Sequence, residues 1–214
     1  MSAVATDLAF DGSSSPLGDS RLRDLVVRAA IGLLRERALT DVTLADVAAA
    51  AAVERAAVEA EFDSMNDLVV VVIRAWNRDR MAPLQSVAEQ RGAVAFLRSI
   101  VGANLTDPAL MRLMTSMVNV AGTPNHPIAP LLQQQWVQFH AHVQRALAHD
   151  IEVGREPSTM EPASGAEQLI ALYEGLQLQS MLRPNMDLMA SFDRAVTRLR
   201  DGWARDYAVP TWDI

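Results

Sequence analysis

Residues 43–68 read TLADVAAAAAVERAAVEAEFDSMNDL and contain two signals for the start of a helix. Thr43 is followed three residues later by Asp46, which is the spacing of a capping box, where the hydroxyl meets an exposed backbone amide and the acid reaches back. Ser64 and Asp67 repeat this spacing. The stretch therefore predicts one short helix after Thr43 and another helix after Ser64.

The sequence on either side of this stretch also has a helical pattern. From Arg21 to Arg37, apolar residues recur at spacings of three and four, which predicts an amphipathic helix. The helix after Ser64 should continue toward Pro83. Clear breakers separate four or five further helices, at about 92–105, 107–121, 127–152, 163–183 and 187–206. Because no segment has the alternating pattern of a strand, the predicted fold class is all-α.

The composition excludes several classes of protein. Of the 214 residues 50% are apolar but only 5% are aromatic, so Ala, Leu, Val and Met must fill the core. Cysteine is absent, which excludes disulfides and cysteine metal sites and fits a reducing compartment. All 19 basic residues are arginine, so lysine chemistry such as Schiff-base catalysis is excluded. With no secretion signal and no apolar run near ~20 residues, we expect a cytoplasmic protein without membrane contact.

Residues 1–20 differ from the rest of the chain. They are rich in Gly and Ser, contain three aspartates and have no basic residue. Such a composition is typical of a segment that cannot bury enough apolar surface to fold. We expect a disordered acidic arm there.

The stretch from Arg21 to Leu68 resembles, without a gap, the DNA-binding region of the tetracycline-repressor (TetR) family of transcriptional regulators. That region has three short helices, of which the second and third form a helix-turn-helix. The matching residues are mostly packing and capping positions: Ala29, Ala30, Thr43, Val47, Ala48, Val53, Phe62, Ser64, Asp67 and Leu68. Further along, His126-Pro127 and residues 169–184 (LIALYEGLQLQSMLRP) resemble the family more loosely.

This resemblance implies a TetR-like architecture, in which an N-terminal three-helix helix-turn-helix module precedes a C-terminal helical bundle that dimerises. The implied domains are the arm at 1–20, a helix-turn-helix, DNA-binding-like domain at 21–65, and a helical ligand-binding and dimerisation domain at 66–214. It also implies a regulator that responds to a small-molecule effector. A helical enzyme is a third, disfavoured alternative, because the chain has no Cys, no Lys and no recognisable nucleophile, acid-base or metal constellation.

The predicted recognition helix departs from the family pattern. Where the family carries glycines, hydroxyl groups, aromatic residues and a lysine, this chain has Ala52, Glu54, Ala56, Ala57, Glu59, Glu61 and Met65. Residues 21–62 contain six arginines and seven acidic residues, whereas a DNA-facing module is normally positive. Because phosphate neutralisation supplies most of the affinity for DNA, we expect DNA binding to be impaired. The alternative is that the substitutions tune specificity, since a glutamate can accept a hydrogen bond from cytosine.

Five residues are the candidates for DNA contact: Arg21, Arg23, Thr43, Arg55 and Ser64. Ala52 occupies the turn position where the family has glycine. If that position requires a positive backbone angle, alanine is strained there by roughly 1 kcal/mol. The turn is then expected to be reshaped or continued as helix.

The later helices are rich in methionine, which is flexible and suits pockets that adapt to apolar ligands. By resemblance, an apolar effector binds between these helices, where a few polar groups orient it. Residues that share helix faces are the candidates for this pocket: Met111, Met114, Met117, Trp136, Phe139, His140, Tyr173, Gln177 and Met181. For each of them the alternative is an ordinary place in the core.

The resemblance further implies a homodimer formed by the last two helices. The apolar residues with suitable spacing are Leu169, Leu172, Leu176, Leu188, Phe192, Val196 and Leu199. Their alternative role is packing within one chain.

The histidines do not predict a metal site. His142 and His149 lie seven residues apart, but Arg145 between them opposes a cation and no cysteine completes a ligand set. We expect no metal, no cofactor and no catalytic residue. Two functions stay open. One is a TetR-like regulator with an apolar effector and double-stranded DNA as partners, and the other is a ligand-binding or co-regulator protein of this fold that no longer binds DNA.

Overall fold

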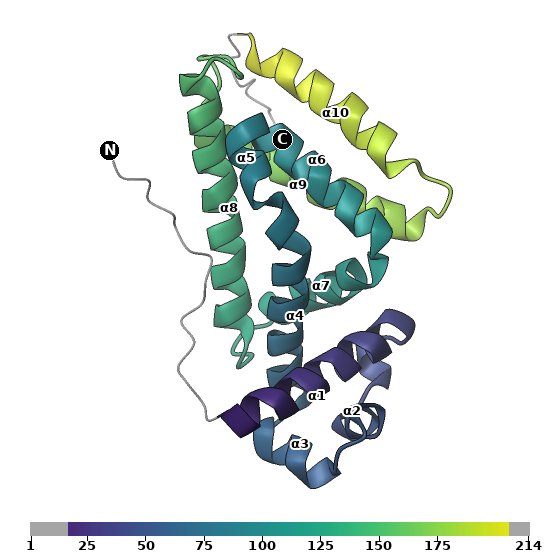
Figure 1. The fold of residues 1–214 in the computed structure, drawn as a ribbon. Helices are drawn as coiled ribbons and strands as arrows, with labels where there is room; N and C mark the ends of the chain where they lie inside the picture. The colour runs from purple at the N-terminus through teal and green to yellow at the C-terminus, as the bar shows by residue number, and fades with distance from the viewer. Residues whose placement is uncertain (1–16, 206–214) are drawn as a thin grey trace.

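The computed structural model describes residues 17–205, which form ten α-helices and two short 3-10 helices (Figure 1). No strand occurs among these residues, which confirms the predicted all-α class. Nor does any helix in this range combine the length and the apolar character that a membrane span requires.

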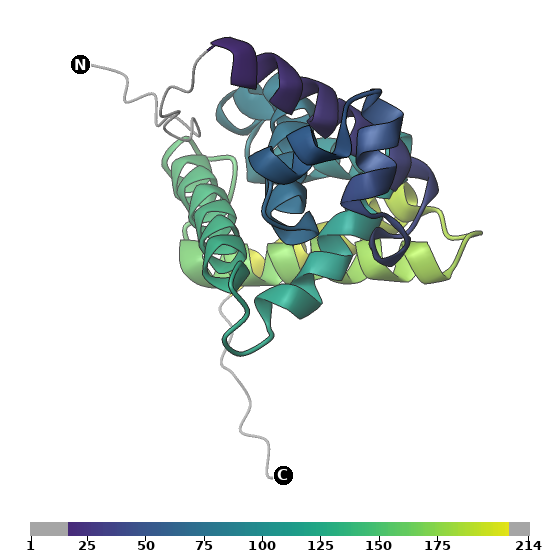
Figure 2. The same cartoon turned by 90° about the horizontal axis from the view of Figure 1, so that it is seen from below.

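The N-terminal elements form one end of the molecule, at the bottom of Figure 1. They are α1 (Leu17–Glu36), the short helix η1 (Leu39–Asp41), α2 (Leu44–Ala51), α3 (Arg55–Glu61) and the start of α4 (Met65–Met81). α2 packs against both α1 and α3, as a helix-turn-helix requires. In Figure 2, which views the molecule from below, α2 and α3 lie toward the viewer.

α4 leads from this end into the helical body. The body consists of η2 (Ala82–Leu84), α5 (Gln85–Arg91), α6 (Ala93–Thr106), α7 (Pro108–Ala121), α8 (Ala129–Glu152), α9 (Pro162–Leu182) and α10 (Leu188–Trp203). α9 packs against α8 and α10, and α6 packs against all three. α10 lies at the end of the molecule opposite to α2 and α3 (Figure 1).

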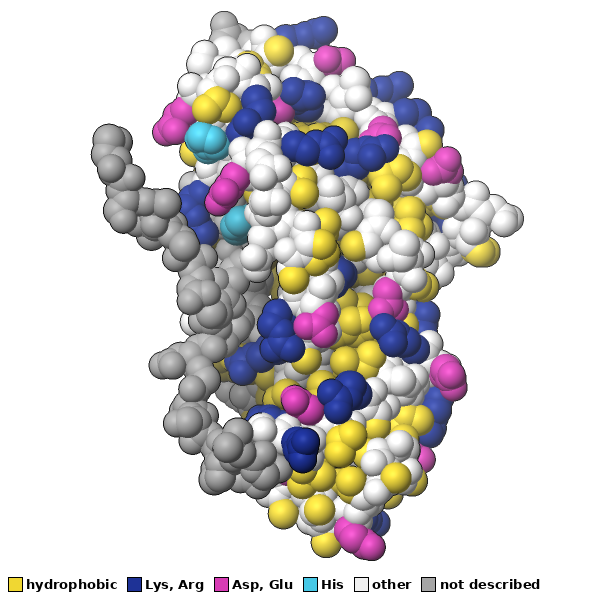
Figure 3. Space-filling model, in the orientation of Figure 1, with side chains coloured by type: hydrophobic (Ala, Val, Ile, Leu, Met, Phe, Trp, Pro, Cys, Tyr) yellow, Lys and Arg dark blue, Asp and Glu magenta, His cyan; other side chains and the backbone are white. Residues whose placement is uncertain are grey.

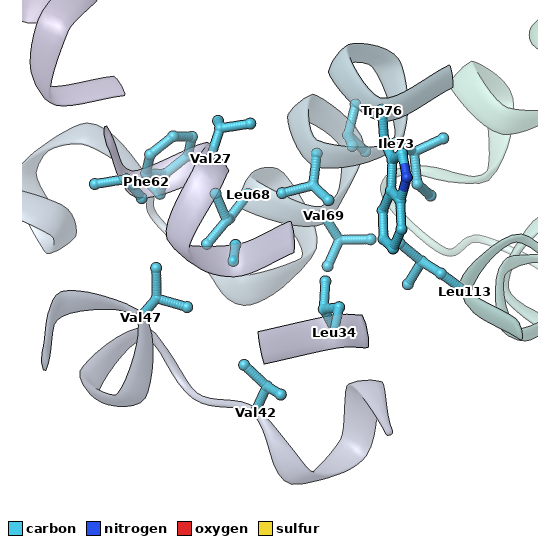
Figure 4. Packing of buried hydrophobic residues seen from close by; sticks show 14 of the residues in the cluster. Val27, Leu34, Val42, Val47, Phe62, Leu68, Val69, Ile73, Trp76 and Leu113 are labelled. Atoms are coloured by element: carbon cyan, nitrogen blue, oxygen red, sulfur yellow. The ribbon is translucent and has the colours of Figure 1, made fainter. Parts of the chain in front are cut away.

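Two clusters of buried hydrophobic residues hold the fold together. The first cluster joins α1, α2, α3 and α4 to α7 and the start of α8, and Figure 4 shows part of it. The second lies among α5, α6, α8, α9 and α10. Val47 of α2 and Leu68 of α4 are completely buried in the first cluster. Since full burial of such a side chain contributes about 1.5–3 kcal/mol, this cluster fixes the N-terminal helices onto α4.

The expected domain boundary between residues 65 and 66 does not coincide with a division in the packing. α4 begins there, but Val69 and Ile73 of α4 share the first cluster with Val47 of α2 and Leu113 of α7 (Figure 4). A capping signal at Ser64 marks the start of a helix and not the edge of a core. α4 therefore belongs to the N-terminal module and to the body at once.

Some helix ends differ from the predicted ones. α1 begins at Leu17, so residues 17–20 of the expected disordered arm are helical, while residues 1–16 lie outside the described range. Extension of an existing helix adds one hydrogen bond per residue, so the polar composition does not prevent it. α5 has no counterpart among the predicted helices, because seven residues with no side-chain cap and one buried residue, Ala88, leave no periodic signal. α10 ends at Trp203 and not near residue 206.

The capping signals behave differently at their two positions. The Thr43 hydroxyl accepts from the Asp46 amide at 3.2 Å, and the Asp46 carboxylate accepts from the Thr43 amide at 2.8 Å, which confirms the capping box. At α4 the Ser64 hydroxyl accepts from the Asp67 amide at 3.2 Å but donates to the Asp67 carboxylate at 2.6 Å. The Asp67 carboxylate thus accepts from the Ser64 hydroxyl but does not accept from the Ser64 backbone amide, the bond that would complete a capping box.

Ala52 keeps the turn conformation of the residue it replaces. Its φ of 54° and ψ of 43° are left-handed, and it ends α2. The Val53 amide then donates to the Ala48 carbonyl at 3.1 Å, as at a Schellman-type helix end. The expectation of a reshaped turn or a continued helix is therefore wrong, because the helix end keeps its geometry and the alanine carries the strain.

Candidate functional site

α3, the predicted recognition helix, is short and acidic on its outer face. Its seven residues are anchored by Val58, which is completely buried in the first cluster. Glu54 precedes the helix without forming a side-chain cap, and Glu54, Ala56 and Glu59 are exposed. The helix presents carboxylates and methyl groups on the side where a DNA-reading helix needs hydrogen-bond donors.

Two of the predicted DNA contacts, both arginines, are paired with the acids of α3. Arg55 Nε donates to Glu59 Oε1 at 2.7 Å, one turn along the helix. Arg23 of α1 lies 2.9 Å from Glu61, and its guanidinium stands 5.5 Å from the centroid of the Phe62 ring. A phosphate must compete with a carboxylate for either arginine.

Two further predicted contacts, both hydroxyl groups, are engaged in capping. The Thr43 hydroxyl donates to the Asp46 carboxylate at 2.6 Å, and this bond lowers the pKa of Asp46. Ser64 donates to the carboxylate of Asp67 in the same way. Arg21 is the one candidate of the five that is exposed and has no ion pair or hydrogen bond with another described residue.

A buried polar cluster lies inside the body, where α4, α6, α7 and α9 meet. Asn104 of α6 donates to the Tyr173 hydroxyl of α9 at 2.9 Å and accepts from the guanidinium of Arg80 on α4. A second nitrogen of Arg80 donates to Asn77 at 2.6 Å. The Met111 thioether of α7 lies 3.9 Å from both the Tyr173 hydroxyl and an Arg80 nitrogen. One set of contacts therefore joins four helices.

Burial shifts two pKa values in this polar cluster. It lowers the pKa of Arg80, because the guanidinium is removed from water, and nearby Tyr173 offsets part of the effect. It raises the pKa of the Tyr173 phenol, which Arg80 and Asn104 partly offset. At neutral pH the cluster therefore contains a charged guanidinium beside a neutral phenol.

Gln177 lies one turn after Tyr173 on α9 and has an unsatisfied polar atom. It is 3% exposed, and its Nε2 has no acceptor among the described residues. A buried donor without a partner costs about 1–3 kcal/mol. An acceptor atom on a bound molecule would satisfy it.

The structure brings together only part of the predicted pocket. The rings of Phe139 and Tyr173 are 6.4 Å apart, and Met111 contacts the Tyr173 hydroxyl. Met117, in contrast, is 1% exposed within the first cluster, and Met114 packs against that cluster.

The other predicted pocket residues on α8 and α9 lie near this region but make contacts of their own. The Trp136 indole donates to Glu174 at 2.8 Å. The Met181 sulfur lies 4.0 Å from the Thr115 hydroxyl. His140 is half-buried on α8.

Arg80, Asn77 and Asn104 are not among the residues predicted from the sequence. Asn104 follows the buried residues Phe96 and Ile100 at the same spacing of four on α6. A polar residue at a position that the spacing assigns to the core could therefore have been predicted to be buried. Arg80 stands in a run of charged residues at the end of α4, and no local pattern separates it from exposed neighbours.

An open cleft of about 580 Å³ lies between α1 and the body, in the hollow across the middle of Figure 3. Its walls come from α1, α4, η2 and α6, together with Asp107. Arg80 lines the cleft and so connects it with the buried polar cluster. None of the nine residues predicted for the apolar pocket lines it.

The predicted dimer residues require a correction. Four of the seven are at most 5% exposed and belong to the second cluster of a single chain: Leu169, Leu188, Phe192 and Val196. They have no surface left for a partner, so packing within the chain, their alternative role, accounts for them. Three keep some exposure: Leu172, Leu176 and Leu199. Spacing alone cannot distinguish the face toward α6 and α8 from a face toward a second chain.

Within residues 17–205, no three side chains of His, Asp or Glu gather in the manner of a metal site. His142 packs against the ring of Phe96, with the centroids 5.0 Å apart. Burial lowers the pKa of His142, and the nearby charge of Arg145 adds to the effect. His149 pairs with Glu152 at 3.6 Å at the surface.

Comparison with solved structures shows the same fold in several regulators. A transcriptional regulator from Pseudomonas aeruginosa has a TM-score of 0.67 at 21% identity, with 87% of this chain and 94% of that chain covered. The complex of SmeT with triclosan has a TM-score of 0.66 at 20% identity, covering 89% and 98%. SmeT is the repressor of the Stenotrophomonas maltophilia multidrug efflux pump SmeDEF. A TetR transcription regulator from Haloarcula marismortui has a TM-score of 0.68 at 15% identity, covering 86% and 98%.

A search of curated protein sequences found no match. The family model for the C-terminal domain of BetI-type transcriptional repressors matches residues 89–204, which is more than half of the chain. The solved structures establish the fold, and the family model establishes the family. This chain belongs to the TetR family of transcriptional regulators and carries a C-terminal domain of the BetI-type repressors.

Proposed function

We propose that this protein is a homodimeric cytoplasmic regulator, and not an enzyme, whose body senses a small, mainly apolar effector and whose α3 binds DNA weakly. One observation carries the weak DNA binding. The arginines at α3 are paired with carboxylates of the same helix, at 2.7 Å for Arg55 and Glu59 and at 2.9 Å for Arg23 and Glu61.

The acids of α3 act against phosphate in two ways. Glu59 and Glu61 occupy the arginines that would otherwise bind phosphate. After displacement, each carboxylate stays close enough to repel the phosphate that replaced it. Glu54 adds a third exposed negative charge at the start of the helix. Because counterion release by phosphate contacts dominates DNA affinity, the loss is expected at every sequence.

A second candidate function is favoured by the donors that α3 lacks. Ala56 and Ala57 carry no polar group, and Glu54 does not cap the helix. With neither base-reading nor phosphate-holding donors on this face, the chain would act as a TetR-fold ligand-binding or co-regulator protein without DNA. Both candidates share the same ligand-binding body.

Support for an apolar effector comes from the centre of the body. Met111 contacts the Tyr173 hydroxyl, the Phe139 ring lies 6.4 Å from the Tyr173 ring, and Gln177, one turn after Tyr173, has an unsatisfied donor. A molecule that fits there is apolar over most of its surface and carries one hydrogen-bond acceptor for Gln177. The related SmeT structure is a complex with triclosan, a small molecule bound by that regulator.

The polar cluster offers a route from this region to the N-terminal module. Tyr173 bonds Asn104, which bonds Arg80, and Arg80 lies on α4. α4 also packs in the first cluster with the helix-turn-helix. An effector that binds one arrangement of Tyr173 and Gln177 better than another would shift α4 with it, since coupling requires different affinities for two states.

Support for the homodimer comes from an exposed stripe along α9. Residues at alternating spacings of four and three lie on one face of the helix and are all exposed: Ser164, Gln168, Ala171, Gly175, Leu178 and Leu182. Leu178 is 48% and Leu182 is 75% exposed, although the opposite face of α9 is buried. The later part of this stripe is therefore apolar and uncovered, and an identical stripe of a second chain, related by a two-fold axis, would cover it.

The test is binding of the purified chain, without added ligand, to pooled genomic fragments at about 50 mM and about 150 mM salt, with sequencing of what is retained. Retention at the lower salt alone, without one preferred site, supports weak DNA binding. No retention at either salt supports the second candidate. Retention of a single palindromic site at the higher salt contradicts both.

A further inference from the structure

The cleft between α1 and the body is bounded by both parts of the molecule. α1 contributes Arg28 and Arg35, α4 contributes Trp76 and Arg80, and Asp107 follows α6. In Figure 3 hydrophobic side chains form the bottom of this hollow, and basic and acidic side chains lie around its edge. Its volume of about 580 Å³ is typical of small-molecule sites.

One side of the cleft is electrically neutral. Arg35 lies 2.9 Å from the Asp107 carboxylate, and the same carboxylate accepts from the Trp76 indole at 2.7 Å. The Arg35 guanidinium also lies over the Trp76 ring, 5.2 Å from its centroid. These contacts hold α1 and α4 to the end of α6 and leave no free charge there.

The other side of the cleft is positive. Arg28 and Arg80 form no ion pair with any described residue. The remaining acid of the cleft, Asp79, lies 3.3 Å from Arg78, which is not part of the lining. In a chain of net charge −7, two arginines that form no ion pair therefore face one cleft, and the more distant charge of Asp107 acts on Arg80.

Of the two arginines, Arg80 is the one that a bound anion would stabilise more. Its terminal nitrogens donate to the neutral amide oxygens of Asn104 and Asn77, and its Nε has no acceptor among the described residues. A guanidinium stays protonated in proteins, so burial cannot be relieved by loss of the proton. A buried charge with only neutral partners is costly, and a nearby anion reduces that cost.

The wall beside these arginines is apolar. Ile31 of α1, Pro83 of η2 and Ala103 of α6 line the cleft together with Trp76. An inorganic anion would leave this surface uncovered. A molecule with an apolar portion as well as a negative charge matches both halves of the cleft.

We propose that the cleft binds a small organic carboxylate, with Arg28 and Arg80 as its cationic partners and the wall at Ile31, Pro83 and Ala103 against its apolar portion. This site lies outside the effector region around Gln177, and the two share only Arg80, which lines the cleft and belongs to the buried polar cluster.

The position of the cleft gives its occupant a regulatory consequence. The carboxylate contacts α1 of the N-terminal module and α4 of the body at the same time. With its apolar portion against Ala103 of α6, the bound molecule therefore favours the arrangement of α1, α4 and α6 seen here over any other arrangement. A ligand that prefers one arrangement of two parts opposes any second ligand that prefers a different one.

The experiment is calorimetric titration of the full chain with naphthoate, and with naphthamide of the same ring position as an uncharged probe of equal shape. We expect one naphthoate per chain, binding that weakens as salt rises, and naphthamide weaker by about tenfold or more. Equal binding of the two probes overturns the proposal.

Variants locate the bound carboxylate. Arg28→Gln removes a cation of the cleft and should weaken naphthoate binding by about threefold, as expected for a partly exposed charge. Arg21→Gln removes an exposed arginine on the same face of α1, outside the cleft, and should leave binding unchanged. Ala103→Leu fills the cleft without a change of charge and should abolish binding. If Gln177→Met weakens binding while Arg28→Gln and Ala103→Leu do not, the anion binds inside the body and the proposal is wrong.

Discussion

Arg23 on α1 and Glu61 at the end of α3 form an ion pair of 2.9 Å that joins the first helix of the module to its recognition helix. The Arg23 guanidinium also lies over Phe62, so it stays beside α3 even when the acid is removed. In the proposed function, Arg23 is therefore a phosphate contact for which a neighbouring carboxylate competes.

Glu61→Gln should release Arg23 for DNA. We expect nonspecific affinity for a labelled duplex to rise about threefold to tenfold at about 50 mM salt, because one more cation meets phosphate. The free energy of unfolding should change by less than about 1 kcal/mol, as for other surface pairs. Fluorescence anisotropy and urea unfolding measure the two quantities. Glu36→Gln, an exposed acid at the far end of α1, is the control, and an equal rise there would show a general charge effect.

Ala52→Gly should stabilise the protein, although glycine usually destabilises. Ala52 has a φ of 54°, which costs an alanine roughly 1–2 kcal/mol and a glycine nothing. After the extra entropy of unfolded glycine is subtracted, the free energy of unfolding should rise by up to about 1 kcal/mol. Ala49→Gly, inside α2, should lower it by about 1 kcal/mol. Urea unfolding of both variants checks the opposite signs, and a loss at both positions would exclude a strained turn.

Gln177→Met should also raise the free energy of unfolding. The buried Nε2 of Gln177 has no acceptor among the described residues, and methionine has a similar volume without a donor. The expected gain is about 1 kcal/mol, near the lower end of the cost of an unsatisfied donor. Gln179→Met, two residues later and exposed, should leave stability unchanged. A thermal unfolding series measures both, and destabilisation by Gln177→Met would mean that the amide is satisfied in solution.

His142 should make stability depend on pH below neutrality. Burial, aided by Arg145, lowers its pKa from the ordinary 6.5. The unfolded chain then binds the proton more tightly than the folded chain, so stability is lost as the pH falls through 6.5 toward the lower folded value. Between about pH 7 and about pH 5, His142→Asn should lose less unfolding free energy than the unmodified protein. Urea unfolding across this range measures the difference, and parallel curves would show that His142 titrates normally when folded.

Local signals predicted the helices well. Prolines such as Pro108 and the capping box at Thr43 act within a few residues, so most predicted helix ends lie within two residues of the observed ones. The pair Arg55 and Glu59 is equally local, because residues four apart on a helix are neighbours.

Contacts between distant segments could not be predicted in this way. Arg80 and Asn104 are 24 residues apart, and Asn104 and Tyr173 are 69 apart, so the polar cluster exists only once four helices have packed. The leucines of α9 and α10 satisfy the same spacing whether they face a core or a partner. Only the packing of α6 and α8 shows that Leu169 and Phe192 face inward.

The effect of the α3 acids on DNA binding is measured most directly by a salt titration of Glu54→Ser, Glu59→Tyr and Glu61→His combined, beside the unmodified protein. The control carries the same three replacements at Glu89, Glu152 and Asp201, which are exposed acids of the body. We predict that the α3 variant alone gains at least about tenfold in nonspecific DNA affinity near 50 mM salt, with a steeper salt dependence. Equal affinity of the α3 variant and the unmodified protein at every salt concentration would contradict the claim that these acids weaken DNA binding.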